Sequence, residues 1–292
     1  MRVHSDNPVM IDPNPPNVAR VHVVKTAPEP DDVSARPEPL QIAYSTTRVM
    51  ADALLRLQRH PGVVKMDRSE LAETFKMLRN QLLLRMRADG HRVLAVSSPR
   101  AIEGKSLTAV NLALTIAADY DCAVLLVDGD LAQHGLQRLF GLEGAAGLGE
   151  HLTMGTPLSE LFISPGVNRL VLLPAGREAL SNSAELLATK AAQHLIQELK
   201  QRYSDRYIVV DLPPLLDTAD AMAFLPHVDT TLLVVEEHTT SQADMESTAA
   251  LLASFNLVGT VMSKGRDARD VQTGAAAKRQ PWYTRWLGDR ST

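Results

Sequence analysis

The chain has 292 residues, of which 45% are hydrophobic and 22% are charged, and its formal net charge is −4. This composition is ordinary for a globular protein. It argues against a dedicated nucleic-acid-binding protein, which would carry a strong positive charge. No apolar run approaches the roughly 20 residues of a membrane-spanning helix, and no apolar core of a secretory signal is visible near the first residue. Together with the single cysteine, Cys122, these features predict a cytoplasmic protein that does not bind nucleic acid.

Three segments follow from the proline and apolar content of the chain. The first 40 residues hold eight of the 17 prolines and no glycine, so they cannot bury enough apolar surface to offset the entropy lost on ordering. We therefore predict a disordered segment over residues 1–45 and a folded domain over residues 46–264. From residue 265 the apolar periodicity stops, and residues 265–292 are predicted to be a basic and aromatic tail.

Two helices are expected at the start of the folded domain. Residues 46–59 favour a short helix, and a longer helix is expected from about Ser69 to Met86. Ser69 is suited to cap the amino end of the longer helix, and Gly90 is suited to stop it. Its apolar residues recur at helical spacing, which predicts a face that packs against the core: Leu71, Phe75, Leu78 and Leu82.

Strand-like and helical stretches then alternate. Six short runs rich in Val, Leu and Ile lack polar alternation, as is typical of strands buried on both faces of a parallel sheet. These runs are residues 92–98, 123–130, 169–176, 207–214, 230–237 and 257–264. Helices are expected between them at residues 105–118, 184–202, 219–225 and 241–254. The pattern predicts a doubly wound, mostly parallel α/β sheet with helices on both faces, whose ligands bind at the carboxyl ends of the strands.

The stretch SSPRAIEGKSLTAVNLA (97–113) resembles a phosphate-binding loop that lacks its first glycine, since Pro99 stands in that place. It follows the first core strand and opens a helix, which is the context such a loop requires. Backbone N–H groups can bind phosphate oxygens, Lys105 can neutralise the β- and γ-phosphates, and the Ser106 hydroxyl can bind Mg²⁺. The predicted ATP-binding residues are Glu103, Gly104, Lys105, Ser106 and Leu107. The alternative is an ordinary Glu-Gly-Lys-Ser surface turn.

Carboxylates follow two of the predicted strands. Asp128 and Asp130 end the run VLLVDGDL, and Asp211 ends the run YIVVD. The carboxyl ends of parallel strands share one edge of the sheet, so these acids would repel one another unless a cation compensates. Mg²⁺ bound to phosphates supplies that compensation. The alternative is that the aspartates only cap turns, but their number beside Gly-Lys-Ser favours a nucleotide site of the P-loop NTPase type.

Five segments in order carry a resemblance to a known family: SPRAIEGKSLTAVNLA, VLLVDGDLAQHGLQRLFGL, LLPAGREALSNSAELL, IVVDLPPLLDTADA and NLVGTVMSK. They resemble the bacterial tyrosine kinases of polysaccharide export, of the CpsD/CapB type, within the MinD/ParA-like deviant P-loop ATPases. The resemblance covers residues 69–264. The upstream series Glu73-x-x-Lys76-x-x-Arg79 is similar to the E-x-x-R-x-x-R element by which that family packs subunits into a ring.

The resemblance implies a protein-tyrosine autokinase that uses ATP and Mg²⁺ and regulates the polymerisation and export of exopolysaccharide. Lys105, Asp128, Asp130 and Asp211 would be its catalytic residues, with Asp128 accepting the proton of the incoming tyrosine hydroxyl. Mg²⁺ would be held by Ser106, Asp128 and Asp211, partly through water. The resemblance also implies a homo-oligomer and a membrane-spanning chain-length regulator as partner. That partner would recruit the cytoplasmic chain to the inner face of the plasma membrane.

Three positions depart from the family pattern. Ile102 stands where the family has glycine. If the backbone needs a positive φ there, a β-branched residue costs on the order of 1–2 kcal/mol. Ala132 stands where the family has an arginine, which removes a cationic contact near the phosphates or the neighbouring subunit. Ser263 replaces an asparagine that would help recognise the adenine.

The tail also departs from the family, whose tyrosine cluster is reduced to Tyr283 within residues 265–292. Tyr283 is therefore the candidate phosphoacceptor. These departures leave a second hypothesis open, namely a catalytically weak ATP-binding regulator that acts on the membrane partner without phosphorylating tyrosine. A positioning ATPase of the MinD/ParA type has less support, because its second signature lysine is missing and only Arg100 lies near that place.

Overall fold

The computed structural model describes residues 47–65, 69–119, 121–202 and 206–263. The segment 1–45, predicted to be disordered, and the tail 265–292, which includes Tyr283, lie outside the described residues. The boundaries of these three segments therefore stay predictions.

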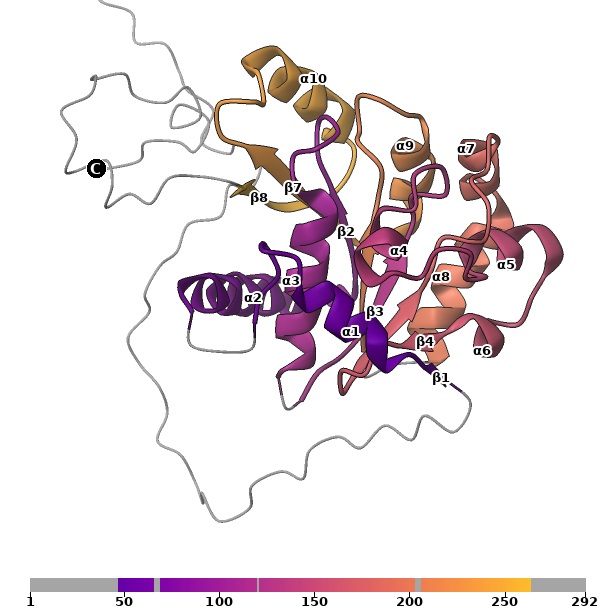
Figure 1. The fold of residues 1–292 in the computed structure, drawn as a ribbon. Coiled ribbons are helices and arrows are strands. Elements are labelled where there is room, and N and C mark those ends of the chain that lie inside the picture. Colours follow the sequence, from indigo (N-terminus) through magenta and orange to yellow (C-terminus); the bar gives the residue numbers. More distant parts are fainter. Residues whose placement is uncertain (1–46, 66–68, 120, 203–205, 264–292) are drawn as a thin grey trace, which may run out of the picture. The chain divides into compact units, whose positions relative to one another are not determined.

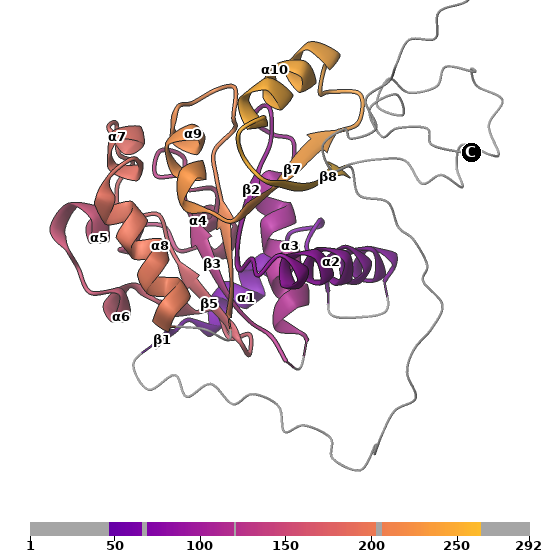
Figure 2. The ribbon, with the colours of Figure 1, turned by 180° about the vertical axis from the view of Figure 1, so that it is seen from behind.

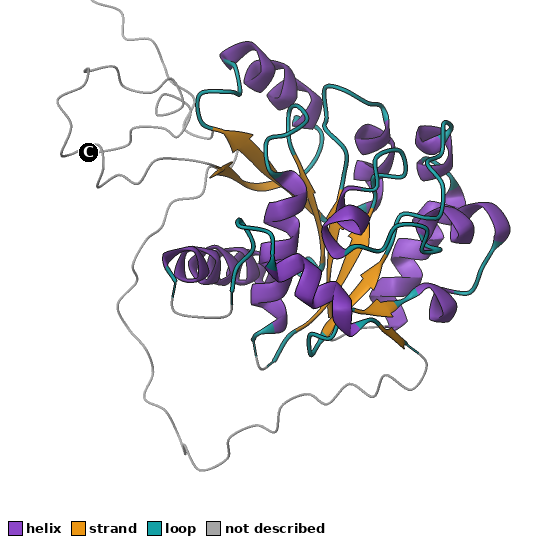
Figure 3. Ribbon diagram, in the orientation of Figure 1, coloured by secondary structure: helices purple, strands orange, loops and turns teal. Residues whose placement is uncertain are grey.

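Within the described residues, eight strands form one sheet in the order β1-β4-β5-β3-β6-β2-β7-β8 (Figures 1 and 3). Neighbouring strands run parallel except for β4 and β5, which pair antiparallel at Ile163 and Leu172. The strands are β1 (Arg48–Val49), β2 (Val93–Ser97), β3 (Ala123–Asp128), β4 (Ile163–Ser164), β5 (Leu170–Leu173), β6 (Arg206–Asp211), β7 (Thr230–Glu236) and β8 (Leu257–Ser263). The predicted doubly wound, mostly parallel sheet is confirmed.

Helices cover both faces of the sheet, as Figures 1 and 2 show from opposite sides. They are α1 (Ala51–Gln58), α2 (Glu70–Ala88), α3 (Lys105–Ala117), α4 (Gly135–Phe140), α5 (Leu148–Met154), α6 (Leu158–Leu161), α7 (Ser183–Leu187), α8 (Lys190–Arg202), α9 (Asp220–Phe224) and α10 (Gln242–Leu252), with a 3₁₀ turn at Leu225–His227. Each face buries its own apolar cluster. Helices α1 to α4 pack on one face, and α5 to α10 pack on the other.

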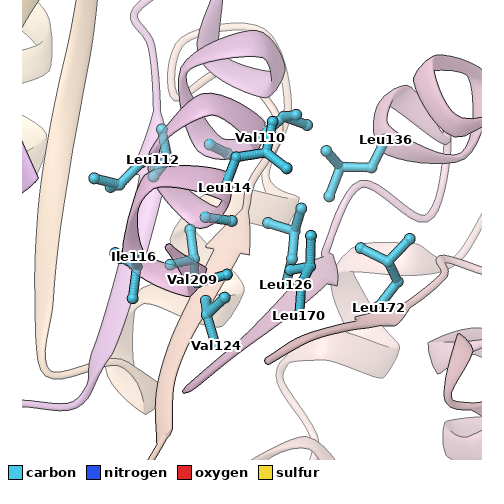
Figure 4. Packing of buried hydrophobic residues seen from close by; sticks show 14 of the residues in the cluster. Val110, Leu112, Leu114, Ile116, Val124, Leu126, Leu136, Leu170, Leu172 and Val209 are labelled. Carbon is cyan, nitrogen blue, oxygen red and sulfur yellow. The ribbon is translucent and has the colours of Figure 1, made fainter. Parts of the chain in front are cut away.

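Helix α3 is the most deeply buried helix of the first face. Its side chains Val110 and Leu114 lie over Leu126 of β3 and Val209 of β6, as Figure 4 shows. The helix is buried almost all round, because it contacts α2 and α4 as well as the strands of the sheet. This packing fixes the amino end of α3 relative to the strand ends where the predicted site lies.

The alternation of strands and helices was predicted correctly from residue 92 onward, but several details differ. The expected helix 184–202 is two helices, α7 and α8, and the short elements β1, β4, α4, α5 and α6 had no prediction. Ser69 caps α2 as expected, by accepting a hydrogen bond from Ala72 N at 3.3 Å. The predicted inward face of α2 is partly wrong: Leu71 is exposed, and the buried residues of α2 are Ala72, Leu82, Leu83 and Met86.

The crossover connections diverge next to β2. Strand β3 lies on one side of β2, with β6 inserted between β3 and β2. Strand β7 lies on the other side of β2. Ligands of doubly wound sheets bind at such a reversal, outside the carboxyl ends of the strands. The loops that follow β2, β3 and β6 therefore meet at one place.

Candidate nucleotide and phosphoryl-transfer site

The loop between β2 and α3 presents free backbone donors. Helix α3 begins at Lys105, directly after Gly104, whose φ of +91° lies in the left-handed region. In the described part of the chain, no acceptor pairs with the N–H groups of residues 103–107, whereas Thr108 N donates to Gly104 O at 2.9 Å. Unpaired N–H groups at a helix amino end, reinforced by the helix dipole, form an anion site. The predicted phosphate loop thus has the geometry that its chemistry needs.

Ile102 adopts the backbone conformation that its family position suggested. Its φ is +72°, and its side chain is 85% exposed. A β-branched residue in the left-handed region is strained by about 1–2 kcal/mol. The positive φ on which the expected strain depends is found, and burial of the Ile102 side chain does not offset that strain.

Glu103 directs its side chain away from the free N–H groups of the loop. Its buried carboxylate accepts hydrogen bonds from Thr240 Oγ1 at 2.7 Å and from Arg100 N at 3.3 Å. Burial raises the pKa of this carboxyl, and the two hydrogen bonds only partly offset that effect. Glu103 was predicted to bind ATP, and only its backbone N–H is available to a phosphate.

Lys105 lies among three carboxylates. Its Nζ is 3.3 Å from Asp130 Oδ2, 3.8 Å from Asp211 Oδ1 and 3.4 Å from Ser106 Oγ. Burial alone would lower the pKa of Lys105, but the charges of Asp211, Asp130 and Asp128 raise it above its ordinary value. The ammonium group is therefore protonated at neutral pH.

Asp128 ends β3 and is fully enclosed. Its carboxylate accepts hydrogen bonds from Asp130 N at 3.2 Å and from Gln137 N at 3.1 Å. Burial and the negative charge of Asp211 nevertheless raise the pKa of Asp128 to about 8. A general base is most effective when its pKa lies near the working pH, so Asp128 has the proton affinity of such a base.

Asp130 follows two residues later and has a different environment. Its Oδ2 pairs with Lys105, and its Oδ1 accepts a hydrogen bond from Gln133 N at 2.9 Å. The Asp130 side chain thus holds Lys105 from one side and caps the turn that leads into α4 from the other.

Asp211 ends β6, and its carboxylate is the side-chain group of this site that is most available to bind a ligand. In the described residues, neither of its buried carboxylate oxygens has a partner in hydrogen-bonding geometry. Burial raises the pKa of Asp211, although the neighbouring Lys105 ammonium and Ser106 hydroxyl act against that rise. The Lys105 ammonium at 3.8 Å offsets part of its charge, but a buried carboxylate without hydrogen bonds is costly unless a cation binds it directly.

The space beside Asp211 fits a cation. A Cβ atom at Gly135 would lie 2.9 Å from Ser106 Oγ and 3.7 Å from Asp211 Oδ2, so glycine keeps open the room that these two oxygens face. A hydroxyl and carboxylates are the hard oxygen ligands that Mg²⁺ prefers. Ser106 and Asp211 therefore have the chemistry to hold a Mg²⁺ ion beside bound phosphates, and the role of Asp128 in metal binding stays a prediction.

Comparison with known proteins agrees with this geometry. No protein-family model matches the chain. The tyrosine-protein kinase YwqD of Bacillus subtilis is 28% identical over 210 residues, which cover 71% of this chain and 87% of YwqD. The succinoglycan biosynthesis transport protein ExoP of Rhizobium meliloti is 34% identical over 181 residues, which cover 60% of this chain but 22% of ExoP.

A solved structure shares both fold and sequence. The kinase domain of the Escherichia coli tyrosine kinase ETK superposes with a TM-score of 0.62 at 25% identity, covering 78% of this chain and 93% of that domain. The chain is similar in sequence and fold to bacterial tyrosine kinases of the CapB and CpsD type. This group shares the fold of the MinD ATPases.

Two further contacts support the phosphate loop and the strand-end aspartates of this chain. Ser263, at the end of β8, donates a hydrogen bond from Oγ to Glu103 O at 2.6 Å, so the residue that replaces the family's asparagine ties the edge strand to the loop. Gln137 was not predicted. Its side chain bonds Gly176 N and Gly176 O, both at 2.9 Å, and its N–H holds Asp128. No local pattern distinguished it from other residues of α4.

The residues predicted to form an oligomer interface lie on α2. Glu73 and Lys76 are paired with each other at 2.8 Å on the surface. The side chain of Arg79 is largely buried, and its NH1 donates to Thr115 O near the carboxyl end of α3 at 3.0 Å. Arg79 thus links α2 to the helix that carries the phosphate loop.

Neither the cavities nor the length of the helices points to a second site or a membrane span in the described residues. Two cavities of about 270 Å³ each lie elsewhere: Asp229 is among the residues that line one, and Arg177 is among those that line the other. Neither is lined by Lys105 or by the strand-end aspartates. None of the helices within the described ranges has the length and apolar character needed to cross a bilayer.

Proposed function

We propose that this chain transfers the γ-phosphoryl group of Mg-ATP to tyrosine, and that it thereby regulates polymerisation and export of an exopolysaccharide. One observation carries the proposal. The free N–H groups at the start of α3 and the Lys105 ammonium lie at the carboxyl ends of β2, β3 and β6. Beside them lies the Asp211 carboxylate, which has no hydrogen-bond partner among the described residues. This arrangement can hold a triphosphate and its metal ion, and the comparisons place the chain among tyrosine kinases.

Different groups of the chain would bind the phosphates and the Mg²⁺ ion. The N–H groups of residues 103–107 and the Lys105 ammonium would bind the phosphate oxygens. Ser106 and Asp211 would hold Mg²⁺, with Asp128 bound to it through water. When bound, the metal ion neutralises charge on the phosphates.

Asp128 would act on the acceptor tyrosine. Its carboxylate accepts the proton of the tyrosine hydroxyl as the phenolic oxygen forms a bond to the γ-phosphorus. The bond to the bridging oxygen breaks, and ADP leaves. Lys105 stabilises the negative charge on the transferred group, and Asp130 keeps Lys105 in place.

The proposal extends to assembly and place in the cell. ExoP is a transport protein of succinoglycan biosynthesis that contains a segment similar to this chain. We propose that a membrane-spanning chain-length regulator is the partner here and recruits a cytoplasmic homo-oligomer to the inner face of the plasma membrane. Glu73, Lys76 and Arg79 would pack neighbouring subunits, and Tyr283 would accept phosphate.

Phosphotyrosine mapping tests the proposal. The full chain is incubated with Mg-ATP, with and without the cytosolic segment of its membrane partner, and mass spectrometry then locates phosphate. Phosphate on Tyr283 is expected. It should be lost in Lys105→Ala and retained in Lys190→Ala, which changes an exposed lysine at the start of α8. Absence of phosphotyrosine in both conditions would overturn the kinase activity.

A second function is favoured by one observation. Position 132 is alanine, so the turn after Asp130 offers no cation from that residue to the phosphates. The alternative is an ATP-binding regulator that acts on the membrane partner without phosphorylating tyrosine. In the same experiment this alternative predicts ATP binding that depends on Lys105, with no phosphotyrosine.

A further inference from the structure

The first part of the phosphate loop is held by acidic side chains of the protein. Asp217, in the segment between β6 and α9, accepts a hydrogen bond from Ala101 N at its Oδ2, at 2.9 Å. The Glu103 carboxylate accepts one from Arg100 N at 3.3 Å. The N–H groups of residues 103–107 stay free. The loop is thus divided into a part bound to the protein and a part open to an anion.

Arg100 extends this attachment to a third element. Its NH1 lies 2.8 Å from Asp217 Oδ1, and its NH2 lies 2.8 Å from Asp244 Oδ1 in the first turn of α10. Asp244 is itself fixed by Ser241, whose Oγ donates to Asp244 Oδ2 at 2.6 Å. Asp217 therefore holds the loop twice, through the backbone of Ala101 and through the side chain of Arg100.

Ile102, the residue that follows Ala101, has a backbone conformation that its surroundings must maintain. Ile102 has a φ of +72°, a conformation that most side chains avoid. Its own side chain is 85% exposed, so packing of that side chain does not fix the backbone. The constraints on Ile102 come from the bonded neighbours on both sides, Ala101 and Glu103.

We propose that Asp217, together with Arg100 and Asp244, is a positioning clamp that keeps Ile102 in the left-handed conformation and so holds the free N–H groups of the loop ready for phosphate before nucleotide arrives. Asp217 is a positioning residue, since it acts through the loop backbone. The inference depends on the proposed function only for the identity of the ligand, a nucleoside triphosphate. Where glycine stands in the loop the conformation is unstrained, so the clamp matters because this chain carries isoleucine.

The clamp predicts a specific rescue. In the full-length chain, Asp217→Ala should weaken binding of Mg-ATP about tenfold by titration calorimetry, a change of about 1.4 kcal/mol. In the background of Ile102→Gly, the same substitution should weaken binding less than about threefold, because glycine adopts a positive φ without strain. Glu246→Gln, an acid of α10 bonded only to Gln242 within the described residues, is the control and should leave affinity unchanged.

A second measurement needs no nucleotide. Amide hydrogen exchange of a peptide covering residues 98–104 should be at least about tenfold faster in Asp217→Ala than in the original chain, with no change in Glu246→Gln. Unchanged exchange, or an equal loss of affinity in the isoleucine and glycine backgrounds, would overturn the clamp. A chain that binds no Mg-ATP but shows the exchange difference would instead refute the proposed function and leave the clamp standing.

Discussion

Asp128 and Asp211 are paired directly across the parallel strands β3 and β6, so two buried carboxyl groups face the same end of the sheet. Burial raises the pKa of both groups, and the negative charge of Asp211 raises that of Asp128 further. Two acids in this position oppose folding at neutral pH unless a proton or a cation neutralises them. These two carboxyl groups therefore lower the stability of the nucleotide-free chain, and the same groups allow the site to bind a metal-bound phosphate.

The stability of the nucleotide-free chain should fall as pH rises between about 4 and 8. The folded pKa of Asp128 is about 8, far above the ordinary value of 3.8, so the folded chain keeps a proton that the unfolded chain releases. Stability from this group is fully present below pH 4 and is lost as pH rises through 8, at no more than about 1.4 kcal/mol per pH unit. Urea denaturation at several pH values measures the slope.

Asp128→Asn is the matched variant for this slope. The amide retains an oxygen acceptor but carries no charge, so the pH dependence should become shallower by the contribution of one group. The same variant should slow phosphoryl transfer by about 10²–10⁴-fold if Asp128 is the base. An unchanged slope would show that Asp128 is ionised in the folded chain.

Ile102→Gly should stabilise the nucleotide-free chain. Glycine removes a left-handed strain of about 1–2 kcal/mol but adds about 0.5–1 kcal/mol of backbone entropy to the unfolded state. Little packing is lost, because the side chain is exposed. A net gain of up to about 1.5 kcal/mol is expected from urea denaturation. Ile102→Ala should give no such gain, and an equal gain in both variants would contradict strain as the cause.

Gly135→Ala should weaken metal-dependent binding of ATP. The added Cβ would lie 2.9 Å from Ser106 Oγ and intrude on the space beside Asp211. The affinity for ATP in the presence of Mg²⁺ should fall at least about tenfold, a change of about 1.4 kcal/mol. Calorimetric titrations with and without Mg²⁺ test this expectation.

The control for Gly135→Ala is Gly259→Ala in β8, where the nearest atom to an added Cβ is Arg85 NH1 at 3.9 Å. The Gly259 variant should bind Mg-ATP normally. If Gly135→Ala bound Mg-ATP as well as the original chain, the metal would not occupy the space between Ser106 and Asp211.

Local pattern was enough to predict the elements that carry the site. The strands β2, β3 and β6 are buried on both faces, and burial on both faces demands the continuous apolar runs seen in the sequence. The acids at the ends of β3 and β6 stand out against those runs. Short elements such as β1 and β4, with two residues each, have no run long enough to show a period.

The sequence by itself determined the fold class, the phosphate loop and the three strand-end aspartates, because periodicity and strand-end acids are local properties of the chain. Only the tertiary structure decided which distant groups hold the loop. Asp217 reaches Ala101 across 116 positions, and Ser263 reaches Glu103 across 160. Such contacts depend on the order of the strands and on the reversal beside β2, which short-range pattern does not encode. The same reason explains why Ile102, an anomaly in the sequence, became intelligible once its neighbours in space were known.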